Sequence, residues 1–540
     1  MRRPVRPAAI VRAHGNRAHR NRTLGSRALA AATTVVSISM VAACAVGPST
    51  GPRFVYGGGN GGGAVTSAPT QPPLEVPSSD LPWRDCTSAQ VQQAGLTSAP
   101  SGITFSCASI QPPIAPGASS DDTIDVDIVR ASASDTPKDA APVVFTTGSD
   151  IESGFALALL TASDGASLLK SHPIVAVDRR GLGPSTIVDC ITKADRATIY
   201  ANGFGRDNAN PSRAKRLSDA ANSAASGCND ILTPNQADFP AAYAAADLET
   251  LRGLWKVNRI AIIGIGDGAS VATAYAAQHP DHVARLVLDT PAPYATGMQE
   301  TSQQIAAGTD AALTGFADQC RALSCALGDD PRSAIAALQA QAKSGNLPGL
   351  SDADVLAAIR LGIGPYAGDR SAAITATATM LANAAQGNLA TLQSAAARAH
   401  AVFDTDGQLL TRCADTNSPV GQAQAVTLMD QWNKAYPLTG YQTAISTQRC
   451  NGWPSIADPA PSPTTFRTPT LVLDGTFDPI NGDKGIDDVR AMLITAGAPL
   501  GVMSWAGLGY SAIIHSDCAA ETVSRYLNSG TTPQSSACPA

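Results

Sequence analysis

The sequence predicts an α/β protein in which a mostly parallel sheet is covered by helices on both faces and a helical segment is inserted into the sheet. Short apolar runs of four to six residues alternate with helical stretches over residues 124–289, which is typical of parallel strands buried on both faces. From about residue 295 to 460 this alternation stops, and Ala-rich helical stretches follow one another. Strand-like runs resume at residue 468, so the helical segment interrupts the sheet.

At 540 residues, the chain is long enough for one large domain with an insertion, or for two domains. Its composition, 44% hydrophobic and 15% charged, indicates a globular protein and argues against a coiled coil or a disordered chain. The formal net charge is −6, but residues 1–43 contain eight Arg and no acid, which leaves 30 basic against 44 acidic residues, or −14, in the rest. Because no basic patch is interleaved with aromatic residues, we expect no nucleic-acid partner.

Residues 1–43 are predicted to be a lipoprotein signal peptide. A basic stretch precedes an apolar one that is short for a membrane span and that ends in Val41-Ala42-Ala43-Cys44. Small residues followed directly by cysteine look like a bacterial lipobox, which implies cleavage before Cys44 and lipidation of its sulfur. An ordinary secretory signal with an incidental cysteine is the alternative. We therefore expect an exported protein at the outer face of the cell membrane, attached through its lipid anchor only, with a flexible Gly-, Ser- and Pro-rich tether over residues 44–80.

The folded part is predicted to consist of two core segments around the inserted helices. The first core segment spans 81–294, the helical cap 295–460 and the C-terminal core segment 461–540. Strands are expected at 124–128 (an edge strand), 142–146, 173–178, 260–263, 284–289, 468–474 and 501–505. Helices are expected at 213–226, 241–254, 269–278, 299–342, 352–361, 372–386 and 390–402. In this arrangement the cap precedes the last two strands of the sheet.

The stretch Gly264-Ile265-Gly266-Asp267-Gly268 joins an apolar run to an Ala-rich helix. Strand, tight glycine turn and helix are the context of the nucleophile elbow, G-x-S-x-G, of α/β-hydrolases. In that motif the central residue carries the nucleophile at a strained corner, and the outer glycines allow the strand and the helix to approach closely. Here the outer glycines are Gly264 and Gly268, but the central residue is Gly266, which has no nucleophile. The sequence therefore predicts an α/β-hydrolase fold whose elbow lacks its reacting atom.

Further motifs, in a consistent order, carry a resemblance to one family. They are Val-Asp-Arg-Arg-Gly-Leu-Gly-Pro-Ser185, Val188-Asp-Cys190, Ala246-Asp-Leu-Glu249, Tyr275-Ala-x-x-His-Pro280, Cys413-Ala-Asp415, Cys450-Asn-Gly-Trp-Pro454, Leu471-Val-Leu-Asp-Gly-Thr-Phe-Asp-Pro479, Gly507-Leu-Gly-Tyr510 and Tyr526-Leu-x-x-Gly530. Through them, residues 81–540 resemble the secreted tripeptidyl-aminopeptidase-like and proline-iminopeptidase-like serine hydrolases, which have the α/β-hydrolase fold.

The resemblance implies a catalytic triad in the chain order Ser, Asp, His. The acid is retained as Asp478, whereas the nucleophile position is Gly266 and the histidine position is Tyr510. The turn that would stabilise an oxyanion carries Asp150 and Glu152, two acids that would oppose a developing negative charge. The resemblance thus implies a serine peptidase homologue with a degenerate site. We expect Asp478 to form hydrogen bonds within its loop, with Tyr510 as a further partner.

Two other residues are alternative catalytic groups. Asp267 is a carboxylate at the elbow, and some α/β-hydrolases use an aspartate nucleophile, but a turn centred on it places Ile265 where close packing needs a small residue. His515 lies five residues beyond the base position and is expected to be structural or exposed. Ser270, one helical turn past Gly266, is expected to face a neighbour. The remaining candidates, expected to lie away from the edge of the sheet where sites of this fold form, are His172, His279 and His282.

The ten cysteines after Cys44 form an even set, which favours disulfides in an exported protein. Their number permits many connectivities, but they fall in the chain as neighbours, and local pairing fits the family pattern. The expected pairs are Cys86–Cys107, Cys190–Cys228, Cys320–Cys325, Cys413–Cys450 and Cys518–Cys538. No C-x-x-C pair or Cys/His cluster supports a zinc site, and we expect neither a metal nor a cofactor.

These features predict a catalytically degenerate hydrolase homologue that binds a peptide or lipid-like ligand under the cap. The alternative is an active peptidase- or esterase-like hydrolase that uses rearranged residues. A third class, a purely structural envelope lipoprotein, predicts a collapsed and filled cleft, so the volume of the cleft separates it from the other two. Because glycine relaxes the corner of the elbow, we expect Gly266→Ser to destabilise the fold by only about 1 kcal/mol.

Overall fold

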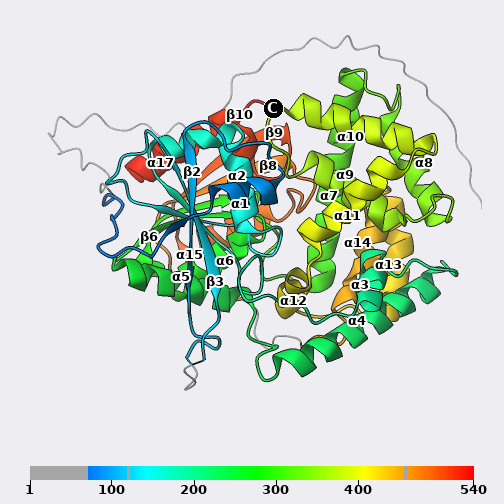
Figure 1. Ribbon diagram of the computed structural model, residues 1–540, viewed down its shortest axis with the longest axis horizontal. Coiled ribbons are helices and arrows are strands. Elements are labelled where there is room, and N and C mark those ends of the chain that lie inside the picture. The colour runs from blue at the N-terminus through cyan, green and yellow to red at the C-terminus, as the bar shows by residue number, and fades with distance from the viewer. Residues whose placement is uncertain (1–70, 118–121, 455–459) are drawn as a thin grey trace, which may run out of the picture. The chain divides into compact units, whose positions relative to one another are not determined.

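A computed structural model describes residues 71–117, 122–454 and 460–540 of the protein (Figure 1). The predicted signal peptide, Cys44 and most of the predicted tether lie outside the described residues. Residues 71–80, predicted as the end of the flexible tether, contain no helix or strand but are bonded to the core. Glu75 accepts a hydrogen bond of 2.7 Å from the Asn258 N–H, and the Ser78 N–H donates to the Trp255 carbonyl at 3.1 Å. The folded body therefore begins before residue 81.

The described residues form one ten-stranded sheet in the order β1-β2-β3-β5-β4-β6-β7-β8-β9-β10. Its strands are β1 (Arg84–Asp85), β2 (Ile103–Ile110), β3 (Val126–Ala133), β4 (Val143–Thr146), β5 (Ile174–Val177), β6 (Ile260–Ile265), β7 (Val283–Asp289), β8 (Thr470–Phe477), β9 (Leu500–Leu508) and β10 (Ser536–Cys538). All neighbours from β5 to β10 are parallel, whereas β3 is antiparallel to both β2 and β5. This is the sheet of an α/β-hydrolase fold, as the sequence predicts.

Two strand predictions were incomplete. The predicted edge strand at 124–128 is instead internal, because β2, for which we made no prediction, pairs with β3 along its whole length. The short strand β10 extends the opposite edge beside β9, so three strands rather than two follow the inserted helices. The other predicted strands are present within a few residues of their expected ends.

Helices cover both faces of the sheet (Figure 1). One face packs against α5 (Ala241–Trp255), α6 (Gly268–Gln278) and α15 (Ile486–Ala496). The other packs against α1 (Thr87–Ala94), α2 (Ser153–Thr161), η1 (Asp164–Lys170), α16 (Ala512–His515) and α17 (Asp517–Ser529). Successive strand residues point to opposite faces: Val144 and Ile262 belong to the first core, and Phe145 and Ile263 to the second. The short helix η2 (Pro280–His282) follows α6.

Between β7 and β8 the described chain forms helices and no strand. These helices are α7 (Met298–Ala322), α8 (Pro331–Lys343), α9 (Asp352–Ile363), α10 (Arg370–Ala385), α11 (Ala390–Phe403), α12 (Asp406–Ala414), α13 (Gln422–Ala435), α14 (Gly440–Ser446) and η3 (Thr447–Cys450). We refer to α7–α14 with η3 as the helical insertion. Its helices α7 to α11 share a third apolar core that includes Phe316, Ile335 and Ile359. The predicted helix 299–342 is two helices, separated by a turn that Cys320–Cys325 closes.

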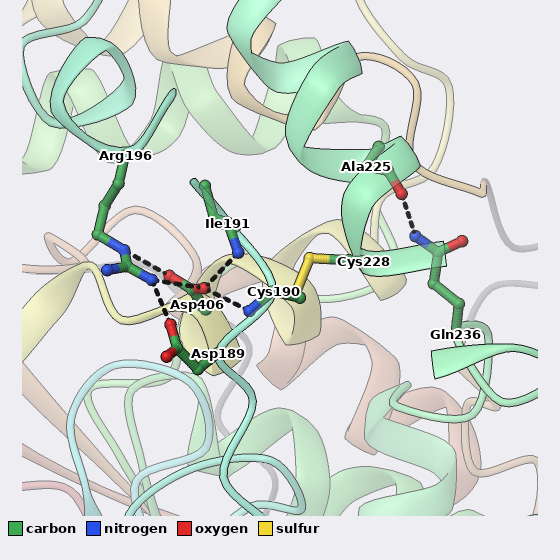
Figure 2. Close-up of a disulfide and its surroundings, with 8 residues drawn as sticks. All are labelled: Asp189, Cys190, Ile191, Arg196, Ala225, Cys228, Gln236 and Asp406. Atoms are coloured by element: carbon green, nitrogen blue, oxygen red, sulfur yellow. Dashed lines mark hydrogen bonds and ion pairs between the residues drawn. A yellow bond between two sulfur atoms is a disulfide. The ribbon is translucent and has the colours of Figure 1, made fainter. Parts of the chain in front are cut away.

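Two helices from the first core segment join the insertion. These are α3 (Lys193–Tyr200) and α4 (Asn210–Leu232), which lie between β5 and β6 in the chain, and α4 packs on α13 and η3 (Figure 1). The Asp406 carboxylate, at the start of α12, accepts hydrogen bonds from the Cys190 and Ile191 N–H groups at 2.9 and 2.8 Å and from Arg196 at 2.9 Å (Figure 2). The Cys190–Cys228 disulfide ties the same loop to α4 (Figure 2). Segments distant in sequence are thus fixed around the insertion.

All five predicted disulfides are present: Cys86–Cys107, Cys190–Cys228, Cys320–Cys325, Cys413–Cys450 and Cys518–Cys538. Such a set is typical of proteins exported to an oxidising compartment. Within the described ranges, no helix is both long and apolar enough to cross a membrane.

Removing the Cys190–Cys228 disulfide should cost more stability than removing Cys320–Cys325. The first closes a loop with a sequence separation of 38 and the second one with a separation of 5, and the loss of unfolded-chain entropy grows with loop length. We expect the paired Cys→Ala variants to lose about 4 and about 2 kcal/mol of unfolding free energy, respectively, measured by urea denaturation. An equal loss in the two variants would contradict this order.

Candidate functional site

The loops after β4 and β6 lie side by side at the end of the sheet where the carboxyl termini of the strands meet. Thr146 of β4 is in register with Gly264 of β6, so the turn after each strand enters the same region. The two outer glycines of the elbow are required by close contacts. A Cβ atom on Gly268 would lie 2.0 Å from the Thr146 carbonyl oxygen, and one on Gly264 would lie 2.5 Å from that of Gly268. The elbow therefore has its expected backbone.

The central residue of the elbow keeps a strained conformation without a side chain. Gly266 has φ of +55°, the left-handed region that favours glycine. A Cβ atom there would lie 2.0 Å from Oδ2 of Asp150 and 2.4 Å from Nδ2 of Asn481. The space that a nucleophilic side chain would take is thus filled by an aspartate from the loop after β4. The expected cost of about 1 kcal/mol for Gly266→Ser counts backbone strain only, and the overlap with Asp150 and Asn481 adds to it.

Asp150 is held in this space by three donors, all to one oxygen. Its Oδ2 accepts hydrogen bonds from the Asp267 N–H at 2.9 Å, from Nδ2 of Asn481 at 2.7 Å and from the Tyr510 hydroxyl at 3.1 Å. Burial, and next the charge of Asp267, raise the pKa of Asp150 to about 6. The N–H that follows the nucleophile position is one of the two oxyanion donors in this fold. The Asp150 carboxylate therefore occupies the place of a substrate oxyanion.

Asp267, the alternative nucleophile, is tied to its neighbours through the same loops. Its Oδ2 accepts a hydrogen bond from the Ser149 N–H at 2.7 Å and pairs with the buried guanidinium of Arg179 at 3.0 Å. Arg179 also pairs with Asp415 at 2.5 Å. Asp150 and Asp267 thus each bind a backbone N–H of the loop that carries the other. These contacts give Asp267 a structural role at the elbow.

Asp478, the acid retained from the triad, is fully buried and bonded within its own loop. Its Oδ1 accepts hydrogen bonds from the N–H groups of Ile480 at 2.6 Å and Asn481 at 3.1 Å. Its Oδ2 is buried without a partner among the described residues. Burial raises the pKa of Asp478 well above its usual range. The expected bond from Tyr510 is absent because Tyr510 donates to Asp150 instead.

Glu152, the second acid of the oxyanion turn, does not enter the elbow. It precedes α2, and its carboxylate is bonded to Gln93 of α1. Of the two acids predicted to oppose an oxyanion, only Asp150 therefore lies at the site. Glu152, two residues further along the chain, is the residue at which α2 begins, and its side chain contacts α1 instead.

His515 and Ser270 have no catalytic partner. His515 is buried, its Nε2 lies 3.1 Å from the Gly364 carbonyl oxygen, and its ring stacks on Tyr366 with centroids 4.0 Å apart. Burial lowers the pKa of His515 to about 3, so this imidazole is a poor proton acceptor. Ser270 was expected to face a neighbour, but it lines a cavity, and the described structure gives its hydroxyl no hydrogen bond to a base.

The three other candidate histidines of the sequence analysis, His172, His279 and His282, do not line the cavity beside the elbow. His172 bonds to the Ala141 carbonyl at 2.9 Å. His279 and His282 form a group with Glu249 whose ligand atoms lie within 4.8 Å of one another, a cluster that we did not predict. The Glu249 carboxylate is already bonded to His282 at 3.1 Å and paired with Arg252. A metal ion at this cluster would compete with a fixed guanidinium, so we assign it a structural role.

A cavity of about 380 Å³ lies between the elbow and the helical insertion. Asp150, Asp267 and Ser270 line it on the side of the sheet. The insertion contributes an apolar part and a charged part. The charged residues, none of which we predicted as site residues, are Arg360, His400, Asp404, Arg412, Asp415 and Arg449. They come from α9, α11, α12 and η3 and from residues that follow α11 and α12, so no spacing in the sequence indicates that they converge.

Gly266 and Asp150 should be energetically coupled. We expect Gly266→Ala to destabilise the fold by about 2–4 kcal/mol through overlap with the carboxylate and backbone strain. In an Asp150→Ala background the overlap with the carboxylate disappears and only that with Nδ2 of Asn481 is left, so the cost of Gly266→Ala should fall towards the strain of about 1 kcal/mol. Urea denaturation of the four proteins measures this coupling.

The matched control is Gly253→Ala in α5, where an added Cβ meets no atom within 4 Å. It should have the same effect with and without Asp150. An unchanged cost of Gly266→Ala in the two backgrounds would mean that the Asp150 carboxylate does not occupy the elbow.

Comparisons with known proteins give one family match and several similar solved structures. Residues 436–538 match the model of a family described as TAP-like protein. Among solved structures, the chain is similar to an esterase from Thermogutta terrifontis, with 13% identity, coverage of 78% of this chain and 99% of that one, and a TM-score of 0.33. It is also similar to a bacterial membrane phospholipase A, with 13% identity, coverage of 82% and 89%, and a TM-score of 0.35.

A third similar structure is the haloalkane dehalogenase DatA from Agrobacterium tumefaciens, with 11% identity, coverage of 79% of this chain and 97% of that one, and a TM-score of 0.33. No curated protein matches the sequence significantly. The fold assignment rests on the strand order of the sheet and on the backbone of the elbow. The chain is therefore an α/β-hydrolase-fold protein, and its residues 436–538 are similar to the TAP-like family.

Proposed function

We propose that this protein is a catalytically inactive member of its family that binds a ligand between the elbow and the helical insertion. The observation that carries the proposal is the Asp150 carboxylate, which fills the space of the nucleophile and binds the Asp267 N–H at 2.9 Å. A tetrahedral intermediate needs that N–H for its own negative oxygen. A fixed carboxylate at this point both blocks the position and repels a second negative charge.

The residues at the nucleophile and base positions, Gly266 and Tyr510, supply neither a nucleophile nor a base. Gly266 offers no oxygen or sulfur for attack. The Tyr510 hydroxyl donates to Asp150, and burial together with that carboxylate raises the pKa of Tyr510 well above its usual value of 10.0. A phenol with this pKa, already acting as a donor, cannot accept a proton from a nucleophile at neutral pH.

The cavity favours ligand binding over a purely structural role. A structural lipoprotein without a ligand would be expected to fill its cleft, whereas about 380 Å³ remain beside the elbow. A volume of this size, with apolar residues and a few charged groups, is typical of small-molecule and peptide sites. We therefore propose a peptide or lipid-like ligand at this place.

We also propose that the protein is exported and attached to the outer face of the cell membrane through Cys44. The five disulfides favour an exported protein. The Val41-Ala42-Ala43-Cys44 stretch and the Gly-rich residues after it support a lipid anchor followed by a spacer. Under this proposal the membrane contact is made by the lipid alone.

The native protein should not react with a fluorophosphonate probe or hydrolyse aminoacyl and short-chain ester substrates. Gly266→Ser with Tyr510→His should remain inactive, because the Asp150 carboxylate still fills the oxyanion position. Adding Asp150→Gly is the smallest change that we expect to give measurable turnover. Steady-state assays beside an active relative, which must be labelled and must turn over, test this series.

Turnover by the unmutated protein that is lost in Asp267→Asn or His515→Ala would instead support the alternative, an active hydrolase with rearranged residues. Asp267→Asn removes the charge of the alternative nucleophile, and His515→Ala removes the alternative base. Unfolding curves of both variants show whether a loss of activity is a loss of fold.

The mature protein should begin at Cys44 and carry lipid on its sulfur. Mass spectrometry of the N-terminal peptide from the membrane fraction measures both features. We expect Cys44→Ser to release the protein from the membrane fraction without changing the folded body. An unmodified Cys44 in the native protein, or an N-terminus elsewhere, would exclude the lipid anchor.

A further inference from the structure

Four basic side chains gather on the side of the cavity formed by the helical insertion. They are Arg360 of α9, His400 of α11, Arg412 of α12 and Arg449 of η3. His400 and Arg449 are mostly buried, with 8% and 17% of their side chains exposed, and Arg412 is 34% exposed. Grouping cations in a partly enclosed space is unfavourable unless anions compensate them. The acidic partners of these four side chains therefore determine what this side of the cavity can bind.

His400, Arg412 and Arg449 share one buried carboxylate, Asp404. His400 Nδ1 lies 2.9 Å and Arg449 Nη1 2.7 Å from Asp404, and the other His400 nitrogen lies 2.7 Å from Asp354. Burial alone would lower the pKa of His400, but its bonds to the two carboxylates raise it to about 9. His400 is therefore positively charged at neutral pH, and the charge of Asp404 is divided among several cations.

Arg412 is the member of this set with the weakest acidic partner. Its shortest distance to Asp404 is 3.8 Å, which is too long for a hydrogen bond. Its direct partners are the backbone carbonyl oxygens of Ser149, at 2.9 Å, and Asp150, at 3.4 Å. The guanidinium thus lies beside the elbow loop with its charge only partly compensated.

Arg360 has no ion pair with any described residue. Its Nε donates to the Pro479 carbonyl at 2.8 Å and its Nη2 to the Ile480 carbonyl at 2.5 Å. Burial, and next the nearby charge of Arg412, lower the pKa of Arg360 to about 10. Two neighbouring guanidinium groups at a cavity wall, one without a carboxylate and one with a distant carboxylate, are an arrangement that a bound anion would stabilise.

The surroundings restrict the kind of anion. Leu356, Phe403 and Ile480 line the same cavity beside these arginines, and Ile305 and Met298 line it from α7. On the side of the sheet, the acids Asp150 and Asp267 line the cavity, and Oδ2 of Asp150 is already bonded by three donors. The cavity therefore favours a ligand with an apolar group beside the four basic residues. It does not favour a ligand with a second negative charge near Asp150.

We propose that the cavity binds an amphiphilic monoanion, a carboxylate on an apolar chain, with the carboxylate between Arg360 and Arg412. A carboxylate matches the fork of a guanidinium through two parallel hydrogen bonds, and the apolar chain lies against Leu356, Phe403 and Ile480. The inference rests on the proposed function, since it names the ligand class for the same cavity, and it requires no chemical step.

Calorimetric titration of the purified protein with octanoate, octanamide and octylamine tests the charge requirement. These probes share a chain of the same length and carry a negative, a neutral and a positive head. We expect octanoate to bind at least about tenfold more tightly than either of the others, because only its head compensates Arg360 and Arg412. Equal binding of octanamide, tighter binding of octylamine, or no binding of octanoate would overturn the proposal.

The substitution Arg360→Met keeps the apolar stem and removes the charge. It should weaken octanoate binding at least tenfold, while Arg360→Lys should retain part of the affinity and Arg490→Met, at a half-exposed site in α15 outside the cavity, should change nothing. Unchanged octanoate binding by a folded Arg360→Met protein would contradict the assignment. The comparison of probes on the unmodified protein does not depend on whether this variant folds, and it is independent of the hydrolysis assays that test the loss of catalysis.

Discussion

The site of this protein depends on one buried carboxylate. Asp150 is inserted between the elbow and the loop after β8, where Asp267, Asn481 and Tyr510 donate to a single oxygen. Hydrogen bonds to a charged acceptor contribute about 1.5–3 kcal/mol each and offset part of the several kcal/mol that burying an ion costs; burial still raises the pKa of Asp150. The same three loops carry the groups of a triad in active α/β-hydrolases. The Asp150 carboxylate thus connects these three loops through hydrogen bonds.

This arrangement explains why the substitutions at the elbow belong together. A side chain at residue 266 would overlap Asp150, and a histidine at residue 510 would lack the hydroxyl that bonds Asp150. The exchange of N–H bonds between the loops of Asp150 and Asp267 fixes the two turns relative to each other. Gly266 and Tyr510 are therefore both compatible with the position of Asp150, whose Oδ2 is bonded by three donors.

The helical insertion adds a second electrostatic feature on the opposite side of the cavity. Asp404 gathers His400, Arg412 and Arg449, while Arg360 bonds only to carbonyl groups within the described structure. Oδ2 of Asp150 at the elbow is already bonded by three donors, whereas Arg360 has no carboxylate partner among the described residues.

The sequence by itself determined the α/β-hydrolase fold, the elbow with Gly266 at its centre, the helical insertion and the five disulfides. These features are local: strand and helix periods, a glycine turn and cysteines that are neighbours in the chain. It did not reveal β2 as the partner of β3, because an eight-residue strand with several small polar residues has a weak pattern. Only the tertiary structure decided that Asp150 fills the elbow while Glu152 turns away, and that Arg360, His400, Arg412 and Arg449 meet. Those outcomes depend on the register of β4 with β6 and on how separate helices pack, and such contacts between distant segments leave no periodic signal in a single sequence.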